Sequence, residues 1–362
     1  MALRPTWAEI DLAAVRANVG ALRQLVAPAA VLAVVKADGY GHGAVEIARV
    51  ALDAGAVGLA VALVEEAEAL RAAEVHAPIL LLSDAAPNAL ARAVELGVAL
   101  TVSTHEGVQE ARAAGAAELH LKIDTGMHRA GCEPAAAAEL ALAAGPALVA
   151  VWTHLSEADD LASNATVRQI DRFDHALGSI AAAGCSVPLV HLANSAGALA
   201  HPAARRDVVR CGIAVYGIAP SVALADAVDL VPAMSLRSRV RALRTVAAGE
   251  TVSYGGHWRA EGSTRIATVP IGYADGVPRR LGLVGGEVIV RGRRAPIRGV
   301  VTMDQLMVEV DGDVALDDEV VLLGAQGGAA IDPWEWATRL DTIAYEIVTG
   351  IGPRVPRRYL RG

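Results

Sequence analysis

The stretch VLAVVKADGYGHGAVEIARVALDAGAVGLAV, residues 31–61, contains one complete unit of the predicted fold. An apolar run at Val31–Val35 leads into a polar, glycine-rich turn and then into an alanine-rich segment of helix length. Gly55 follows that segment, and a second apolar run occupies Val57–Val61. Continuous apolar runs suit strands that are buried on both faces of a parallel sheet, and the segment between them is long enough for a crossover helix. The stretch therefore predicts a strand, a helix and a second, parallel strand.

The same unit recurs along the first part of the chain, where helix-length segments rich in alanine and glutamate separate short apolar runs. The runs are Val31–Val35, Val57–Val61, Ile79–Leu82, Val98–Val102, Leu119–Ile123, Leu148–Trp152, Leu189–Leu192 and about Asp207–Arg210. Gly55, Gly97, Gly115, Gly145 and Gly184 stand just before the next run, where glycine commonly ends a helix. Eight such units that close on themselves form a (β/α)8 barrel, which is the α/β fold that we predict for residues 1–230. An open, doubly wound sheet is the alternative.

The pattern changes in the last third of the chain, which we predict to be a second, mostly antiparallel β domain over residues 231–362. Stretches of alternating polarity are separated by turn signals such as Gly285-Gly286. The stretches are Ser235–Val246, Arg265–Tyr273, Glu287–Val290 and Val300–Val310. One helix is expected from Asp332-Pro333-Trp334-Glu335, which offers an N-cap, a proline at the first helical position and an acidic residue at the third. The pattern leaves open whether roughly the first ten residues pack with this domain.

The overall composition excludes several classes of partner. The chain has 362 residues, with 32 basic and 40 acidic side chains and a formal net charge of −8, which argues against nucleic acid or an anionic membrane as a partner. No stretch approaches the roughly 18 uninterrupted apolar residues of a membrane helix, and the start, MALRPTWAEIDL, lacks the apolar segment of a secretion signal. Cys132, Cys185 and Cys211 show no metal-ligand spacing and suggest reduced thiols. We therefore expect a cytoplasmic protein without a metal site.

Lysine occurs at only two positions, Lys36 and Lys122, and arginine supplies the other 30 basic residues. Arginine does not replace lysine where a primary amine must react, because the guanidinium stays protonated and is a poor nucleophile. The count therefore fits two lysines that are retained for their amines, and it fits chance retention equally well.

Unusual polar residues gather where the predicted strands end. In a (β/α)8 barrel the active site lies at the carboxyl ends of the strands. The residues that end or follow the predicted strands are Lys36, Tyr40, Lys122, Asp124, Arg129, His154, His191, Asn194, Ser195, Arg210 and Gly212. Because these strand ends meet at one end of the barrel, we expect the residues to form a site.

Several of these segments also resemble the motifs of one enzyme family. VVKADGYGHG at 34–43 is similar to the cofactor-lysine signature of alanine racemases. The further blocks that resemble the family are KIDTGMHRAG at 122–131, WTHLSEAD at 152–159, HLANSAG at 191–197, RCGIAVYG at 210–217, VSYG at 252–255, GYADG at 272–276, TMDQ at 302–305 and YEIVTGIGPRVPR at 345–357. The blocks occur in the family's order over almost the whole chain, so the sequence is identified as a member of the alanine racemases.

The resemblance implies an isomerase that interconverts L-alanine and D-alanine with pyridoxal 5′-phosphate, usually to supply D-alanine for peptidoglycan. Removal of an α-proton needs an electron sink, and this cofactor supplies one. The resemblance assigns the cofactor-binding lysine to Lys36, which also acts as a base on one face of the substrate. It assigns the second base to Tyr254, which reaches the site of the other subunit, so that a homodimer with shared active sites is expected. His154 is expected to orient and tune Tyr254.

The resemblance also implies the groups that surround the cofactor and the substrate. Arg210 faces the pyridine nitrogen and leaves it unprotonated, because arginine has only donors, and His191 holds Arg210 in place. Arg129 and the partner's Met303 backbone are expected to hold the substrate carboxylate. In several family members the lysine that matches Lys122 is carbamylated, and the resulting carboxylate orients the arginine that corresponds to Arg129.

A phosphate site is expected beside these groups, because barrels commonly bind phosphate after their seventh and eighth strands. The residues expected at the cofactor are Tyr40, Asn194, Ser195, Gly212, Ile213 and Tyr345, and those that narrow or line the substrate pocket are Tyr273, Tyr345 and Asp304.

Three positions depart from the family's pattern and leave the substrate range open. His128 stands where glycine or asparagine is commoner, His257 where threonine is usual, and Thr302 where cysteine or serine is frequent. A racemase that prefers serine or another small amino acid is therefore an alternative. A decarboxylase of the same architecture is disfavoured, since its GGG phosphate loop and its catalytic cysteine motif are missing from the sequence. A non-catalytic pyridoxal-phosphate carrier would resemble the barrel alone, and a cofactor-free barrel would leave the strand-end residues unexplained.

Overall fold

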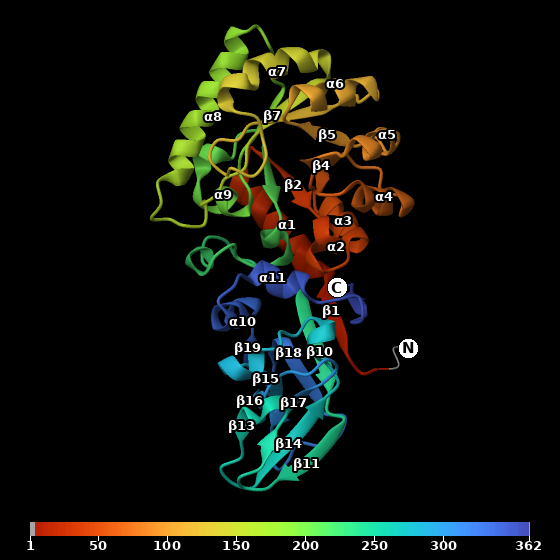
Figure 1. Cartoon of the computed structure of the whole chain (residues 1–362), viewed down its shortest axis with the longest axis vertical. Coiled ribbons are helices and arrows are strands. Elements are labelled where there is room, and N and C mark those ends of the chain that lie inside the picture. Colours follow the sequence, from red (N-terminus) through yellow and green to blue (C-terminus); the bar gives the residue numbers. More distant parts are fainter. Residues whose placement is uncertain (1–3, 362) are drawn as a thin grey trace. The chain divides into compact units, whose positions relative to one another are not determined.

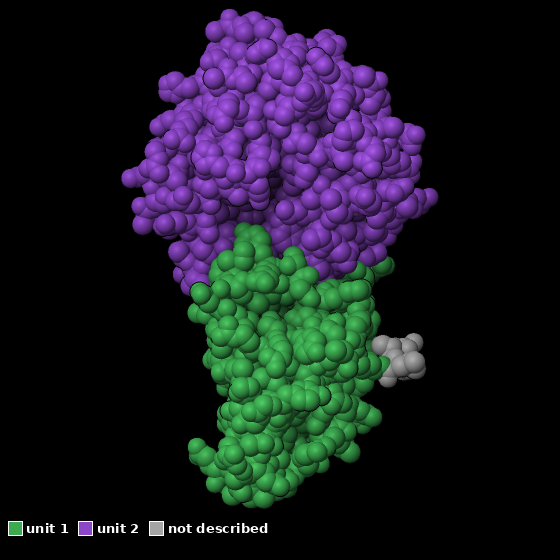
Figure 2. Space-filling model, viewed as in Figure 1, with its two compact units in different colours: residues 1–13, 232–362 green, residues 14–231 purple. Residues whose placement is uncertain are grey.

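The computed structural model describes residues 4–361, which form two compact units (Figure 2). Unit 2 spans Ala14–Val231, and unit 1 combines the chain up to Ala13 with the chain from Pro232 onward. The amino-terminal segment therefore belongs to the same unit as the carboxyl-terminal third of the chain.

Unit 2 contains an eight-stranded, wholly parallel sheet with the order β8-β7-β6-β5-β4-β3-β2-β9. Its strands are β2 (Ala30–Val34), β3 (Gly58–Val61), β4 (Ile79–Asp84), β5 (Ala99–Val102), β6 (Leu119–Lys122), β7 (Leu148–Trp152), β8 (Leu189–His191) and β9 (Val208–Cys211). Backbone bonds from Asp207 N to Val190 O (3.2 Å) and from Arg210 N to Ala193 O (2.9 Å) connect the two ends of the sheet. The predicted barrel is confirmed, and the open sheet is excluded.

Helices lie outside these strands (Figure 1). They are α1 (Leu12–Val26), α2 (Lys36–Tyr40), α3 (Ala44–Asp53), α4 (Val64–Ala72), α5 (Pro87–Glu95), α6 (His105–Ala113), α7 (Ala137–Ala144), α8 (Ala165–Ala182) and α9 (Ser195–Ala200). The strand β3 is buried along its whole length, as a continuous apolar run predicts for a strand covered on both faces. The glycines expected to end helices all have positive φ. The apolar runs and the glycines that end helices therefore predict where the strands of the barrel begin and end, and the candidate site residues lie at these strand ends.

Unit 1 is built mainly from antiparallel strands, as predicted. Its large sheet has the order β16-β15-β18-β10-β1-β20, with β19 added to β18, and only the β1–β20 pair is parallel. A second sheet has the order β11-β14-β17, and β12 pairs with β13. The strands are β1 (Trp7–Asp11), β10 (Met234–Arg239), β11 (Ala242–Val246), β12 (Thr251–Val252), β13 (Trp258–Arg259), β14 (Thr264–Val269), β15 (Glu287–Val290), β16 (Arg293–Pro296), β17 (Leu306–Glu309), β18 (Glu319–Gln326), β19 (Ala329–Ile331) and β20 (Arg357–Leu360).

The structure differs from the expected elements of unit 1 at two strands and one helix. The stretch 235–246 is not one strand, because it divides into β10 and β11, which belong to different sheets. Of the stretch 300–310 only β17 is a strand, and the preceding residues form a loop. The predicted helix is α10 (Pro333–Leu340), and the Asp332 side chain accepts from Glu335 N at 2.9 Å as its N-cap. A second helix, α11 (Ala344–Thr349), was not predicted, and its Ile343 N-cap provides no side-chain capping bond.

Candidate active site

Lys36 begins a left-handed turn at the carboxyl end of β2. Four consecutive residues, Ala37, Asp38, Gly39 and Tyr40, have φ between 51° and 61°. This conformation costs about 1–2 kcal/mol for each residue other than glycine. Two carboxylates stabilise the turn: that of Glu66, from outside the turn, accepts from Ala37 N at 2.6 Å, and that of Asp38, within it, accepts from Ala44 N at 2.9 Å. The turn that presents Lys36 is therefore strained and held by acceptors.

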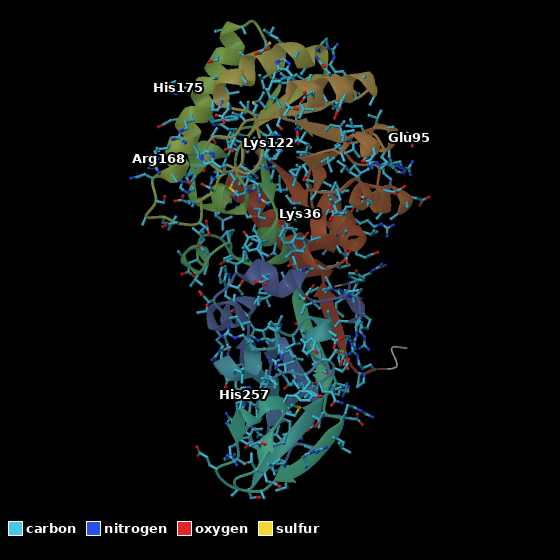
Figure 3. The ribbon with its side chains drawn as sticks, viewed as in Figure 1. Lys36, Glu95, Lys122, Arg168, His175 and His257 are labelled. Carbon is cyan, nitrogen blue, oxygen red and sulfur yellow. The ribbon has the colours of Figure 1, made fainter. Side chains whose placement is uncertain are left out.

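The Lys36 amine is half-buried, and its pKa lies below the ordinary lysine value. Burial is the main cause, the Arg129 guanidinium lowers the pKa further, and the Glu66 carboxylate raises it. Figure 3 shows Lys36 and Lys122, the two lysines of the chain, in the same unit. A larger fraction of the Lys36 side chain is therefore a neutral amine near pH 7 than in an exposed lysine.

Tyr40, Ser195 and Gly212 come together at the ends of β2, β8 and β9. A Cβ atom on Gly212 would lie 2.3 Å from the Tyr40 hydroxyl, so only glycine fits at this close approach. The Gly212 N–H donates to Ser195 Oγ at 2.9 Å, which leaves the serine O–H to donate elsewhere. Asn194 caps α9, because its Oδ1 accepts from Gly197 N at 2.9 Å. The set is rich in O–H and N–H donors, as an anion site requires.

Arg210 is the centre of a buried hydrogen-bond network. Its guanidinium donates to His191 Nδ1 at 2.8 Å, to His154 Nδ1 at 3.3 Å and to the carbonyls of Thr153, His191 and Leu192. Burial and the nearby Arg210 charge keep the pKa values of His154 and His191 well below the ordinary histidine value. Both imidazoles are therefore neutral, and the cation is held rigidly in the barrel.

Lys122 lies against the same network through the indole of Trp152. The Lys122 Nζ atom is 4.6 Å from the Trp152 ring centroid, and the Arg210 Cζ atom is 4.5 Å from it. Burial, followed by Arg129 and Arg210, lowers the Lys122 pKa to about 8, against the opposing effect of Asp84 and Asp124.

The segment after β6 carries Arg129 in a short, capped loop. The Asp124 carboxylate accepts from Gly126 N, Met127 N and His128 N at 2.9–3.1 Å. Arg129 is exposed within unit 2, and its positive charge lies close enough to Lys36 and Lys122 to lower the pKa values of both. The guanidinium is therefore positioned by the loop and remains accessible to an anion.

His120 is a member of the network that the sequence analysis missed. Its Nδ1 lies 3.0 Å from His191 Nε2, and it precedes Lys122 by two residues on β6. Residues two apart in a strand share one face, so a histidine two positions before a candidate lysine was the available signal. The structure therefore extends the network by one imidazole.

In unit 1 the structure brings Tyr273, Met303 and Asp304 together on adjacent loops. Tyr273 N donates to Thr302 O at 2.9 Å, and Ala274 N donates to Met303 O at 3.0 Å. Asp304 pairs with Arg354, which in turn pairs with the fully buried carboxylate of Asp275. The side chains of Tyr273 and Met303 are about half exposed, at 41% and 53%. Asp275 of the GYADG motif, which connects these loops through Arg354, was not among the residues predicted from the sequence.

Tyr254 is 72% exposed in unit 1 and lines an open groove of about 1030 Å³. The groove is bounded by residues of β11, β12, β14 and β17 together with Thr302 and Gln305. Tyr345 lies on α11 and is half-buried. Tyr254, Tyr273 and Tyr345 thus lie on separate elements of this unit.

The described residues show two further features that bear on function. No group of three or more His, Cys, Asp or Glu side chains in residues 4–361 is arranged to hold a metal ion. In the same part of the chain, no helix is long and apolar enough to cross a membrane.

Comparison with known proteins shows similarity along the whole chain. The family model for the N-terminal domain of alanine racemase matches residues 10–220, and the model for its C-terminal domain matches residues 233–359. An alanine racemase of Symbiobacterium thermophilum is 46% identical over 99% of this chain and 97% of its own length. Alanine racemase 2 of Oceanobacillus iheyensis is 40% identical over 99% and 94%.

Solved structures give the same result. The crystal structure of alanine racemase from Bacillus anthracis with bound L-Ala-P has a TM-score of 0.93 and 39% identity, and the match covers 99% of this chain and 95% of that one. Alanine racemase from Streptomyces lavendulae has a TM-score of 0.92 and 42% identity, with 100% and 98% covered.

Proposed function

The chain belongs to the alanine racemase family, and we propose that it interconverts L-alanine and D-alanine with pyridoxal 5′-phosphate bound at Lys36. The observation that carries the proposal is the position of Lys36, a half-buried amine with a lowered pKa, at the strand ends that also carry Arg210 and the donor set of Tyr40, Ser195 and Gly212. These residues supply a reactive amine, a fixed cation and an anion site at one end of a barrel.

The residues present fit the cofactor's chemical groups. The Ser195 hydroxyl and the close approach of Gly212 to the Tyr40 hydroxyl suit a phosphate, which needs donors and room at the backbone. The backbone of Ile213 would add to this site, as would Asn194 by fixing the start of α9. Arg210 offers donors only, so it suits an unprotonated ring nitrogen. When bound, the cofactor supplies an acceptor for the electron pair that remains after the α-proton leaves.

Lys36 would take up and return the α-proton on one face of the substrate. A base must be neutral to accept a proton, and the lowered pKa of Lys36 increases its neutral fraction near pH 7. Inversion also needs an acid–base group on the opposite face, and we assign this role to Tyr254. His154 Nδ1 accepts from Arg210, so its Nε2–H remains to donate to a phenol oxygen. His154 would thereby orient Tyr254 and favour its ionised form.

Arg129 would bind the substrate carboxylate, because it is an exposed cation whose charge acts on both Lys36 and Lys122. The backbone of Met303 would add a donor, and Tyr273, Tyr345 and Asp304 would limit the size of the side chain that enters. Such a restricted pocket favours the methyl group of alanine over larger side chains.

We further propose a homodimer with shared active sites. The exposed Tyr254, the half-exposed Met303 and Tyr273 and the open groove beside Tyr254 are surfaces of unit 1 that a second copy of the chain would cover. The match of residues 233–359 to the racemase C-terminal domain also argues against a carrier built from the barrel alone. The three free cysteines suit the reducing cytoplasm, where D-alanine for peptidoglycan would be made.

Chiral chromatography of L-alanine and L-serine incubated with the purified enzyme and pyridoxal phosphate tests the proposal. D-alanine should form faster than D-serine, and Lys36→Ala should abolish its formation. Faster D-serine formation would retain the mechanism and change the substrate. No D-product from either amino acid, with the yellow cofactor still bound, would overturn the assignment.

A further inference from the structure

The Glu66 carboxylate connects two loops at the strand ends of the barrel. One oxygen accepts from Ala37 N at 2.6 Å, and the other accepts from Ala62 N at 2.8 Å and Leu63 N at 3.1 Å. Glu66 is the third residue of α4, so the same side chain also caps that helix. One carboxylate therefore fixes the residue after Lys36 relative to the start of α4.

The turn after Lys36 depends on such outside support. Ala37, Asp38 and Tyr40 are L-residues in the left-handed region, where the Cβ atom is crowded by the backbone. Such conformations persist when surrounding groups over-determine them. Glu66 bonds the first of these residues directly, at the peptide N–H adjacent to Lys36.

Glu66 also acts on the charge of the Lys36 amine. Burial and the Arg129 guanidinium, from the loop after β6, disfavour the ammonium form, and the Glu66 carboxylate, from α4, favours it. The neighbouring imidazole of His154 is neutral and adds no positive charge to that of Arg129. Among the charged groups that act on Lys36, Glu66 is the one that opposes desolvation.

We propose that Glu66 is a positioning residue for Lys36, which holds the strained turn in place and keeps the amine able to carry a proton as well as to accept one. This inference rests on the proposed function, in which Lys36 takes a proton from one enantiomer and returns it to form the other. A group with both tasks works best when neither of its protonation states is rare at the working pH.

The chain itself offers a direct measurement of the charge effect. Because lysine occurs only at positions 36 and 122, full-length protein labelled with 13C at the lysine Cε, prepared without pyridoxal phosphate, should give two lysine signals. Lys122→Arg identifies the signal of Lys36. In Glu66→Gln the pKa of Lys36 should fall by about half a unit or more, while that of Lys122 changes less.

Glu65→Gln is the matched control. Glu65 lies in the same first turn of α4 but is exposed, so this variant removes the same charge from the same helix end without touching the Lys36 turn. It should leave the Lys36 titration unchanged. An unchanged titration in Glu66→Gln, or an equal shift in both variants, would overturn the charge role.

A second measurement isolates the geometric role. Glutamine still satisfies the capping box of α4, but one of its two head-group atoms is a donor and cannot accept from Ala37 N. The rate at which Lys36 captures pyridoxal phosphate, measured by absorbance at a pH where the amine is neutral in both proteins, should fall about tenfold in Glu66→Gln. Adding Ala37→Gly should restore most of this rate, because glycine adopts positive φ without strain. The fall in the Lys36 pKa that Glu66→Gln causes should remain in this double variant, because the charge of Glu66 is still missing.

An unaltered capture rate in Glu66→Gln, or no recovery with Ala37→Gly, would overturn the geometric role. If Glu66→Gln does not fold, Glu66→Asp serves, since its shorter side chain keeps the charge but cannot reach both loops. It should then slow capture while leaving the Lys36 pKa near its original value. Failure of the proposed function is seen separately, as no D-product from the unmodified enzyme or as racemisation that persists in Lys36→Ala.

Discussion

The guanidinium of Arg210 donates to His191 Nδ1 across 2.8 Å, and both side chains are buried, each with 2% of its surface exposed. Arginine has no acceptor, so His191 Nδ1 must carry the lone pair and His191 Nε2 the proton. That Nε2–H faces His120 Nδ1 at 3.0 Å, which must accept in turn. One contact therefore fixes the tautomers of two histidines.

We predict that His191 and His120 are both neutral with the proton on Nε2. Burial, followed by the Arg210 charge, lowers the His120 pKa to about 4 and the His191 pKa well below its ordinary value. Long-range 15N NMR of histidine-labelled enzyme should show this tautomer for both rings between about pH 5 and 8. An Nδ1–H form of either ring would contradict the network. His120→Leu, which leaves the His191 donor buried and unpaired, should lower the free energy of unfolding by about 1–3 kcal/mol.

Shared active sites predict a specific pattern of complementation between inactive variants. Lys36→Ala and Tyr254→Phe homodimers should each be inactive. If each site combines Lys36 of one chain with Tyr254 of the other, a mixed dimer of the two variants contains one intact site. An equimolar mixture that has been dissociated and reassociated should recover about a quarter of the wild-type activity, because half of the dimers are mixed. Recovery below a few per cent would contradict sharing, and mixing without dissociation is the control.

The barrel could be predicted from the sequence because its strands are buried on both faces. Such strands are continuous apolar runs, and the run Leu148–Trp152 coincides with β7 residue for residue. The β domain was harder to divide into strands. Only two residues separate the end of β10 from Ala242, where the second sheet begins, and the alternating stretch 235–246 carries no turn signal between the two strands.

The candidate site was predictable where a residue lies at or just after the end of a strand and also belongs to a motif. Lys36, His154 and Arg210 satisfy both conditions. Glu66 satisfies neither, and Asp275 belongs to the GYADG motif but follows none of the predicted barrel strands. The roles of both acids depend on a backbone N–H or a guanidinium that the fold brings from far along the chain. Hydrogen bonds of this kind leave no periodic signal in a single sequence.

Gly212→Ala should weaken the binding of pyridoxal phosphate. The added Cβ would lie 2.3 Å from the Tyr40 hydroxyl, and overpacking of this kind typically costs about 1–3 kcal/mol. We expect the dissociation constant from a fluorescence titration to rise at least about tenfold. Gly178→Ala is the control, because nothing lies within 4 Å of the added atom in α8, and it should stabilise that helix without changing the affinity. Unchanged cofactor affinity in Gly212→Ala would show that Tyr40 and Gly212 do not line the site.

His128→Asn should stabilise the enzyme. His128 has φ of +54° and an exposed side chain, and asparagine visits this left-handed region more readily because its short side chain can bond the local backbone. Urea unfolding should show a gain of about 0.5–1 kcal/mol. His76→Asn provides the comparison, since His76 is also exposed but has no positive φ, and it should give no gain. A loss of stability in His128→Asn would indicate a contact that the backbone argument does not include.

Lys122 should form a carbamate with dissolved CO2. Burial, Arg129 and Arg210 lower its pKa to about 8, so a substantial fraction of the side chain is a neutral amine under mildly alkaline conditions. The amine nitrogen would bond to the carbon of CO2 and release one proton to solvent, which gives an anion. Arg129 and Arg210, which disfavour the ammonium, would stabilise this anion. The modification would turn the charge repulsion between Lys122 and Arg129 into attraction and hold Arg129 ready for the substrate carboxylate.

13C NMR of the enzyme under labelled CO2 measures this directly. At constant CO2 pressure the carbamate signal should grow as the pH rises from about 7 to 9, because the neutral fraction of the amine grows through a pKa of about 8. The signal should be present in Lys36→Arg and missing from Lys122→Arg, which separates the two lysines of the chain. If Lys36→Arg abolishes the signal instead, the carbamate belongs to the other amine. A protein that binds no CO2 at either lysine would leave Arg129 to be oriented by the Asp124 loop alone.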